Sequence, residues 1–219
     1  EVWTHRLMTI WQRLQRFWQH RRQLQQSWRQ QRYLALDLET SGLDPKTDQV
    51  LAIGWITLRP PIIDYSSAQY FVTQTNPNLK QSPVVHGMVQ RDFAGAEAPQ
   101  LALTQLAEEL KGAVLVCHHV QFDWQFLLQF AKQHQVALNP LAKFDTLTFE
   151  AQRLQQQQHH LARGSLTLNA CRQRFHLPEY TAHHAYSDAV ACGELFLAQA
   201  YQYAGRSNVA LAELLARCR

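Results

Sequence analysis

The segment "LALDLETSGLDP" at residues 34–45 places two carboxylates, Asp37 and Glu39, inside an otherwise apolar run. Because side chains alternate along a strand, Asp37 and Glu39 point to one face, and the intervening Leu38 points to the other. Burying two like charges this close together without a partner costs several kcal/mol. The segment therefore predicts a strand whose carboxylates either reach solvent at the strand's end or share a positive partner.

The composition is that of a folded globular chain. The sequence has 219 residues, 46% hydrophobic and 17% charged, which suits one large domain or a domain with an appendage and excludes a disordered chain. No run of about 18 apolar residues is present, so no membrane-spanning helix is expected. The N-terminal region lacks the continuous apolar stretch of a secretory signal, which makes a cytoplasmic location the expectation.

The cysteines support the same expectation. They form no CxxC pair and show no regular spacing, and each lies in an apolar or helical stretch. Buried free thiols in a reducing compartment are therefore predicted for all four: Cys117, Cys171, Cys192 and Cys218.

Residues 1–32 differ from the rest of the chain in charge and in periodicity. They hold seven arginines and one acid, so they carry +6 of a net charge that is +4 overall, and the remaining residues sum to −2. Their apolar residues, from Trp3 to Trp28, are mostly spaced by three, four or seven, with Gln and Arg between them. This spacing predicts a basic amphipathic helix of about 25 residues, with a break near His20–Arg22 where the apolar stripe thins.

Three roles are open to this helix. It folds back on its own domain, docks to a protein partner or a second copy, or lies on nucleic acid or another anionic surface. Four of the six tryptophans lie within it, and that much apolar area is rarely left exposed. Packing of the helix on the mildly acidic domain is therefore expected.

The order of the remaining elements indicates an α/β domain. Three strands come first, followed by a helix, a fourth strand and then mostly helices. Strands are expected at 33–39, 49–58, 64–73 and 113–118, and helices at 99–112, 122–134, 145–158, 166–176, 187–203 and 208–217. The chain divides into a helical extension, a main domain and a C-terminal helix packed on that domain, at 1–32, 33–205 and 206–219.

Two further acids, Asp123 and Asp188, stand out by their surroundings. Asp123 lies in "CHHVQFDWQFLLQF", where a strand gives way to a helix, and Asp188 lies in "HHAYSDAVACGELF", near the start of an apolar helix. Taken singly, each has a structural explanation, since acids at helix N-termini complement the helix dipole. Four carboxylates at strand ends and helix starts would instead converge at one edge of the sheet, where oxygen ligands suit Mg²⁺ or Mn²⁺.

Such a site suits phosphodiester hydrolysis. Two divalent ions about 3.5–4 Å apart activate a water and stabilise the leaving oxygen. A histidine of "HHAYSD", with a pKa near ~6.5, would accept the proton of that water.

These motifs, in this order, resemble those of the DEDDh exonucleases, the DnaQ-like 3′–5′ exonuclease family that includes bacterial polymerase proofreading subunits. "LALDLETSGLDP" resembles the first motif, "CHHVQFDWQFL" the second and "HHAYSDA" the third, over about residues 33–203. The resemblance implies an RNase H-like α/β fold, in which helices flank a mixed five-stranded sheet of order 3-2-1-4-5. The segment 141–144 is the candidate for the fifth strand.

The resemblance also implies the catalytic residues. A general-base histidine five residues before the last aspartate selects His183, and the neighbouring His184 leaves a one-residue ambiguity. Tyrosine-type relatives have a tyrosine where this chain has His184, so the histidine class is expected. Two Mg²⁺ or Mn²⁺ ions would be held by four catalytic carboxylates: Asp37, Glu39, Asp123 and Asp188.

The second motif departs from the family pattern. The family has His-Asn-Ala where this chain has His118, His119 and Val120. Both histidines are expected to pack and to hydrogen-bond around the site rather than to bind metal. Asp145 in "FDTLTF" precedes an expected helix and is predicted to cap it.

By the same resemblance, five further residues would bracket the terminal nucleotide: Thr40, Leu43, His86, Met88 and Phe126. Stacking of bases on apolar side chains tolerates any sequence, as a degradative or proofreading enzyme requires. For Met88 and Phe126, a place in the core is an equal alternative.

The resemblance implies a metal-dependent exonuclease that releases nucleoside monophosphates from free 3′ ends. Because the resemblance is to proofreading and DNA repair enzymes, single-stranded DNA is the expected substrate. An exoribonuclease of the same fold and a non-catalytic nucleic-acid-binding subunit are the alternatives, since no motif reports the 2′-hydroxyl.

Overall fold

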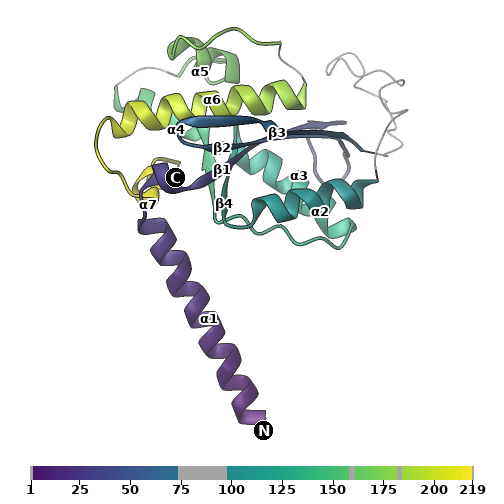
Figure 1. Ribbon diagram of the computed structural model, residues 1–219. Coiled ribbons are helices and arrows are strands. Elements are labelled where there is room, and N and C mark those ends of the chain that lie inside the picture. The colour runs from purple at the N-terminus through teal and green to yellow at the C-terminus, as the bar shows by residue number, and fades with distance from the viewer. Residues whose placement is uncertain (1, 74–97, 158–160, 182–183, 219) are drawn as a thin grey trace.

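The computed structural model describes residues 2–73, 98–157, 161–181 and 184–218 (Figure 1). Its centre is one five-stranded sheet of order β3-β2-β1-β4-β5. The pairs β1–β2 and β2–β3 are antiparallel, and β1–β4 and β4–β5 are parallel. The strands are β1 (Arg32–Thr40), β2 (Val50–Arg59), β3 (Ile62–Val72), β4 (Ala113–Cys117) and β5 (Ala142–Asp145). The mixed sheet, its order and the short fifth strand are therefore confirmed.

Helices cover both faces of the sheet, and β1 shows why. Leu34, Leu36 and Leu38 pack against α2 (Pro99–Leu110) and α3 (Val120–Gln133). Tyr33 and Ala35, on the alternate face, pack against α6 (Ala185–Ala204). Asp37 and Glu39 continue this second row, so the strand directs both carboxylates toward α6.

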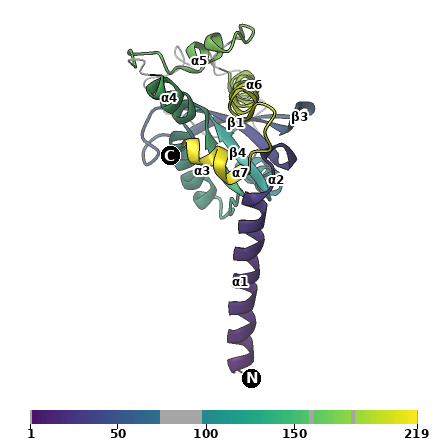
Figure 2. The same cartoon turned by 90° about the vertical axis from the view of Figure 1, so that its left-hand side faces the viewer.

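Two of the remaining helices, α4 (Thr146–Gln156) and α5 (Leu168–Arg174), lie on the same side of the sheet as α6 (Figure 2). They are followed along the chain, after α6, by α7 (Leu211–Leu215) and the 3₁₀ turn η3 (Ala216–Cys218). Leu211 and Leu214 of α7 are fully buried in the same apolar cluster as Phe144 and Phe196. The domain boundaries at 32/33 and 205/206 stay predictions.

The N-terminal helix α1 runs from Val2 to Gln25 and is followed by the 3₁₀ turn η1 (Trp28–Gln30). The predicted break near His20–Arg22 is wrong, because the helix continues to Gln25. It ends where the chain pairs with the C-terminal region: the Trp28 amide donates to the Val209 carbonyl at 3.1 Å. Trp28 is fully buried between Phe196 and Tyr201 and so belongs to the core rather than to the helix.

The expectation that α1 packs on its own domain is wrong for most of the helix. Its C-terminal end does contact the domain: the His20 ring lies 2.9 Å from the Leu141 carbonyl oxygen, and Leu24 packs on the apolar cluster of α6. Both views show α1 projecting away from the sheet (Figures 1 and 2). Trp11, Leu14, Phe17 and Trp18 are 65%, 45%, 53% and 58% exposed. A periodic apolar stripe predicts a helix, but the surface that covers the stripe depends on how the chain leaves the domain, which the stripe does not encode.

Two further expectations concern the cysteines and the membrane. All four cysteines are free, and three are buried, whereas Cys218 is only partly buried. Among the residues that the structure describes, no helix combines the length and the apolar character needed to cross a membrane.

Candidate active site

Three carboxylates of the expected set meet beside the sheet. Asp37 and Glu39 lie on β1, and Asp188 lies in the first turn of α6. Carboxylate oxygens of the three, one from each, all lie within 4.8 Å of one another. Glu39 and Asp188 are buried and Asp37 is partly buried. The packing of α6 on β1 thus brings the carboxylates of the first and third sequence motifs together.

Asp123, the fourth carboxylate, lies in the first turn of α3 and is 3% exposed. It is outside the cluster of three. After burial, however, Asp123 is the largest influence that raises the pKa of Asp37, ahead of Asp188 and Glu39. Asp123 of the second motif therefore lies close enough to Asp37 of the first motif to affect its pKa.

Burial and mutual repulsion make these carboxylates a candidate cation site. Both effects raise the pKa of Asp37 well above its usual range. Burial and the charge of Asp188 raise the pKa of Glu39 to about 7. Burial raises the pKa of Asp123 as well, against a hydrogen bond with Cys117 that lowers it. A divalent cation would remove this repulsion, and oxygen donors are the ligands that Mg²⁺ and Mn²⁺ prefer.

A cavity of about 380 Å³ opens beside two of the carboxylates. It lies between β1, the end of β4, α5 and the start of α6. The residues that line it are Asp37, His118, Thr167, Leu168, Asn169, Tyr180 and Asp188. Its size and the polar side chains among its lining residues suit a nucleotide or a phosphodiester group next to the acids.

His118 contributes structure rather than a metal ligand. Its Nδ1 lies 2.8 Å from Thr146 Oγ1, and its Nε2 lies 2.8 Å from the Leu166 carbonyl oxygen. Burial lowers the pKa of His118, which favours the neutral ring. A neutral ring that donates to the carbonyl from Nε2 accepts the Thr146 hydroxyl at Nδ1. Both ring nitrogens are thus engaged, as the sequence predicted.

His119 stands where the family has asparagine, at a position whose backbone is left-handed. Its φ is 84°, in the left-handed region, which asparagine adopts more readily than most residues. The His119 amide donates to Asp145 Oδ1 at 3.0 Å. The same carboxylate accepts from the amides of Leu147 and Thr148 at 3.0 and 3.4 Å, which confirms that Asp145 caps α4.

Of the residues predicted to contact the terminal nucleotide, some lie within the described residues and some do not. His86 and Met88, and the candidate base His183, lie outside the described residues. Leu43 is 83% exposed on the turn after β1. Thr40 is buried and donates to the Gly42 carbonyl at 2.7 Å.

Phe126 belongs to the core and also lines a small cavity. It packs in the apolar cluster of β1, α2 and α3. It also lines a cavity of about 180 Å³ that Pro45 and Val50 border. The core alternative considered for Phe126 is therefore confirmed, and its contact with nucleotide stays a prediction.

Tyr180 is the site residue that the sequence did not reveal. It lies in the loop before α6 and lines the cavity with Asp37 and Asp188, and after burial the neighbouring Asp188 carboxylate is the next cause that raises the pKa of Tyr180. A single tyrosine eight positions before the aspartate belongs to none of the three motifs, so only the folded loop identifies it.

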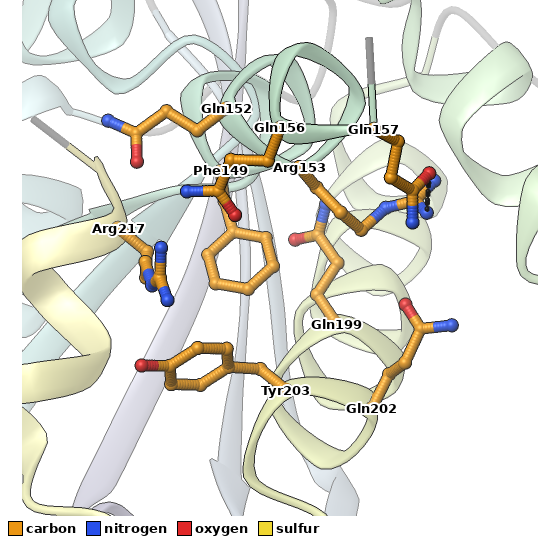
Figure 3. A pocket seen from close by; sticks show the side chains of 9 residues that line it. All are labelled: Phe149, Gln152, Arg153, Gln156, Gln157, Gln199, Gln202, Tyr203 and Arg217. Atoms are coloured by element: carbon orange, nitrogen blue, oxygen red, sulfur yellow. Dashed lines mark hydrogen bonds between the residues drawn. The ribbon is translucent and has the colours of Figure 1, made fainter. Parts of the chain in front are cut away.

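A second cavity, of about 400 Å³, lies between α4, α6 and η3 (Figure 3). Its lining consists of Phe149, Gln152, Arg153, Gln156, Gln157, Gln199, Gln202, Tyr203 and Arg217. None of the described residues that line it is acidic, so it offers no carboxylate to a divalent cation. The catalytic chemistry is therefore sought at the first cavity.

Comparison with known proteins agrees with this geometry. The model of the RNase T family, described as "Exonuclease", matches residues 34–196. The PolC-type DNA polymerase III of Thermotoga petrophila is 23% identical over 168 residues, covering 75% of this chain and 12% of the polymerase. Ribonuclease T of Vibrio parahaemolyticus is 26% identical over 185 residues, covering 74% of this chain and 82% of the relative. The chain thus spans only a small part of the polymerases it matches.

Solved structures show the same fold. The cell-death related nuclease 4 superposes with a TM-score of 0.65 at 15% identity, over 80% of this chain and 65% of the other. Exonuclease I of E. coli, in complex with a dT13 oligonucleotide, gives 0.65 at 15% identity, over 79% of this chain and 41% of the other. The family match runs from the strand that carries Asp37 to the helix that carries Asp188, and the protein therefore belongs to the exonuclease family.

Proposed function

We propose that this exonuclease hydrolyses the terminal phosphodiester bond at free 3′ ends of single-stranded DNA and releases nucleoside monophosphates. The observation that carries the proposal is the convergence of three carboxylates, Asp37, Glu39 and Asp188, within 4.8 Å. A scaffold would gain nothing from burying these like charges together, because their repulsion raises the pKa of Asp37 and Glu39.

The four carboxylates would hold two Mg²⁺ or Mn²⁺ ions. Asp37, Glu39 and Asp188 supply oxygen donors from one cluster, and Asp123 adds a fourth carboxylate beside Asp37. Divalent ions in such a site supply charge neutralisation, a more acidic water and stabilisation of the leaving oxygen. The protein's part is to fix the carboxylates and to exclude bulk water from the phosphodiester group.

His183 is proposed as the general base that takes a proton from the attacking water. Its neighbour His184 has another role in the structure: its ring stacks on Tyr70 with centroids 4.4 Å apart. The His184 amide also donates to Asp188 Oδ2 at 3.3 Å, which ties this segment to the metal-binding aspartate. Because the His184 ring is engaged by Tyr70, the adjacent His183 is the better candidate.

Single-stranded DNA is the proposed substrate. Exonuclease I, which shares the fold, has been solved in complexes with single-stranded DNA. Exposed Leu43, together with Thr40, Phe126, His86 and Met88, would bracket the terminal base and sugar. Stacking on apolar side chains recognises any base and leaves the sequence of the strand unread.

RNA is the second candidate substrate. Ribonuclease T of Vibrio parahaemolyticus is similar over most of its own length, which favours this alternative. Discrimination would depend on contacts to the 2′-hydroxyl. A matched pair of DNA and RNA oligonucleotides, degraded under the same conditions, measures the preference directly.

The test of polarity uses one oligonucleotide labelled at either end. With Mn²⁺, the 3′-labelled strand should lose its label at the first cleavage, whereas the 5′-labelled strand should shorten one nucleotide at a time. A circular single strand, which has no 3′ end, is the matched control and should stay intact. Cleavage of the circle would show an endonuclease, and no metal-dependent shortening of either linear strand would reject the enzymatic proposal.

A further inference from the structure

Tyr180 lies beside the carboxylate cluster. The residue belongs to the loop between α5 and α6 and lines the cavity that Asp37 and Asp188 also line. Burial and then the neighbouring Asp188 carboxylate raise the pKa of the Tyr180 phenol. An ionised carboxylate can only accept, so in a hydrogen bond between the two groups the phenol is the donor.

The Arg172 guanidinium packs over the Tyr180 ring. The guanidinium is 2% exposed, and its central carbon lies 4.9 Å from the centroid of the Tyr180 ring. Nη1 donates to the Ala191 carbonyl at 2.7 Å, and Nη2 donates to the Pro178 carbonyl at 2.8 Å. Nη2 also lies 2.8 Å from Glu194 Oε2. The planar fork of arginine can serve all of these partners at once, which a lysine ammonium cannot.

The backbone on both sides of Tyr180 is fixed to the helices. Arg172, on α5, holds the Pro178 carbonyl two residues before Tyr180. Ser187, on α6, places its hydroxyl 2.7 Å from the Thr181 carbonyl oxygen, one residue after Tyr180. With its ring stacked and both flanks anchored, the tyrosine presents its hydroxyl to Asp188 in one orientation.

A hydrogen bond from Tyr180 is compatible with cation binding by Asp188, because a carboxylate offers about four lone-pair positions. The His184 amide donates to Oδ2 of Asp188 at 3.3 Å. Partners that orient a ligating carboxylate support both metal affinity and activity.

We propose that Tyr180 is a positioning residue of the metal site: its hydroxyl orients the Asp188 carboxylate for a divalent ion, and Arg172 holds Tyr180 in place. The role rests on the proposed function in that it requires Asp188 to be a metal ligand. It assigns a purpose to the buried Arg172 and to the loop before α6, which the three sequence motifs leave unexplained.

The test replaces Tyr180 with phenylalanine in the full chain and measures Mn²⁺ binding by calorimetry without nucleic acid. Tyr180→Phe keeps the ring and its stacking on Arg172 and removes only the hydroxyl. The Kd for Mn²⁺ should rise about tenfold, and the cleavage rate should fall about 10- to 100-fold. Tyr203→Phe is the matched control, since the Tyr203 hydroxyl donates to exposed Glu213 at 3.1 Å, away from the cavity, and this variant should bind and cleave like the wild type.

A double-variant cycle tests the role of Arg172. Arg172→Lys should weaken Mn²⁺ binding when Tyr180 is present and should change it less than about twofold in the Tyr180→Phe background, because the residues act in series. Equal effects in both backgrounds would mean that Arg172 acts without Tyr180. If Arg172→Lys does not fold, the phenylalanine variant alone decides the role of Tyr180.

The outcomes separate this inference from the proposed function. If Tyr180→Phe binds Mn²⁺ and cleaves like the wild type, Tyr180 only packs and the inference is wrong. If the wild type binds Mn²⁺ but cleaves no strand, the exonuclease proposal is wrong, and the binding measurement still decides the role of Tyr180. If the wild type binds no Mn²⁺, the metal site and the role of Tyr180 are both wrong.

Discussion

Gly54 pairs with Asp37 across the β1–β2 ladder and lies against the backbone of Ala185, the first residue of α6. A Cβ on Gly54 would overlap the Ala185 carbonyl group and lie 2.5 Å from the Tyr186 nitrogen, closer than real Cβ contacts. The absence of a side chain on Gly54 therefore lets the start of α6 approach the sheet where Asp188 meets Asp37.

Gly54→Ala should accordingly impair both stability and catalysis. The methyl group would displace the first turn of α6, at a cost of about 1–3 kcal/mol in the free energy of unfolding. A displacement of about 1 Å at Asp188 would lower the cleavage rate about 10²-fold. Denaturant unfolding and a nuclease assay measure the two effects.

Gly193→Ala is the control for that substitution. Its Cβ would lie 3.1 Å from Leu58 Cδ2 and 3.3 Å from Ala35 Cβ, so it would meet side-chain atoms at tight distances rather than overlap backbone atoms as at Gly54. Because Gly193 also lies between α6 and the sheet, it tests whether any added methyl group there is harmful. A Gly54→Ala variant with full activity would contradict the role given to the close approach of α6.

The raised pKa of Glu39 predicts how the stability of the metal-free protein depends on pH. Its pKa is about 7 in the folded chain against 4.5 normally, so folding favours the protonated form. That contribution to the free energy of unfolding is fully present below the unfolded pKa and is lost as the pH rises through the folded one. In EDTA, the melting temperature should therefore fall between about pH 4.5 and pH 7.

Mn²⁺ should oppose this loss. Metal ligands must be deprotonated to bind, so the increase in melting temperature caused by Mn²⁺ should be larger at about pH 8 than at about pH 5. Glu39→Gln does not titrate and should reduce the slope of the curve measured in EDTA, whereas the raised pKa values of Asp37 and Asp123 leave part of the slope in place. A wild-type melting temperature that rises steadily across the same window in EDTA would count against this assignment.

His183 and His184 should differ sharply when each is replaced by alanine. Loss of a general base lowers turnover by about 10²-fold or more, whereas loss of the His184 ring removes a stacking contact with Tyr70. His183→Ala should therefore be nearly inactive with its Mn²⁺ affinity preserved, and His184→Ala should be mildly affected. Initial rates at saturating Mn²⁺ decide, and the reverse ranking would assign the base to His184.

The N-terminal helix should be dispensable for folding. Removal of residues 1–19 takes away Trp11 and Trp18, which are 65% and 58% exposed, and keeps His20, whose Nε2 lies 2.9 Å from the Leu141 carbonyl oxygen. The melting temperature should be unchanged. In contrast, Trp28→Ala removes a fully buried ring and should lower the free energy of unfolding by about 3–5 kcal/mol.

The same truncation addresses what α1 binds. A flatter salt dependence of DNA binding would indicate contact with phosphates, and a changed native mass would indicate self-association. A lower melting temperature of the truncated chain would show that α1 packs on the domain after all.

The sequence predicted what local patterns encode. Alternation in β1 placed Asp37 and Glu39 on one face, and Asp145 before an apolar helix was correctly interpreted as a cap, with its amide partners at 3.0 and 3.4 Å. The place of short β5 at the edge of the sheet, beside β4, followed from the family resemblance and was confirmed. These features depend on neighbours in the sequence or on motifs with fixed spacing.

What the sequence did not predict depends on contacts between distant segments. The end of α1 at Gln25 is set by pairing with the chain around Val209, and Tyr180 acquires its partners only when α5 and α6 pack. Likewise, the apolar stripe of α1 indicated a helix but not the surface that would cover it. Sequence periodicity reports on one helix or strand at a time, whereas these features depend on how two elements pack together.

Asp188→Asn tests most directly whether the cluster of Asp37, Glu39 and Asp188 is the catalytic metal site, as proposed. The measurement is the Mn²⁺-dependent release of the 3′ label from a single strand, with exposed Asp64→Asn as the control. We expect the rate to fall about 10³-fold or more for Asp188→Asn, since metal stabilisation of the transition state is worth several kcal/mol, and to be unchanged for the control. Release at the wild-type rate by Asp188→Asn, with the same dependence on Mn²⁺, would contradict a catalytic metal site in this cluster.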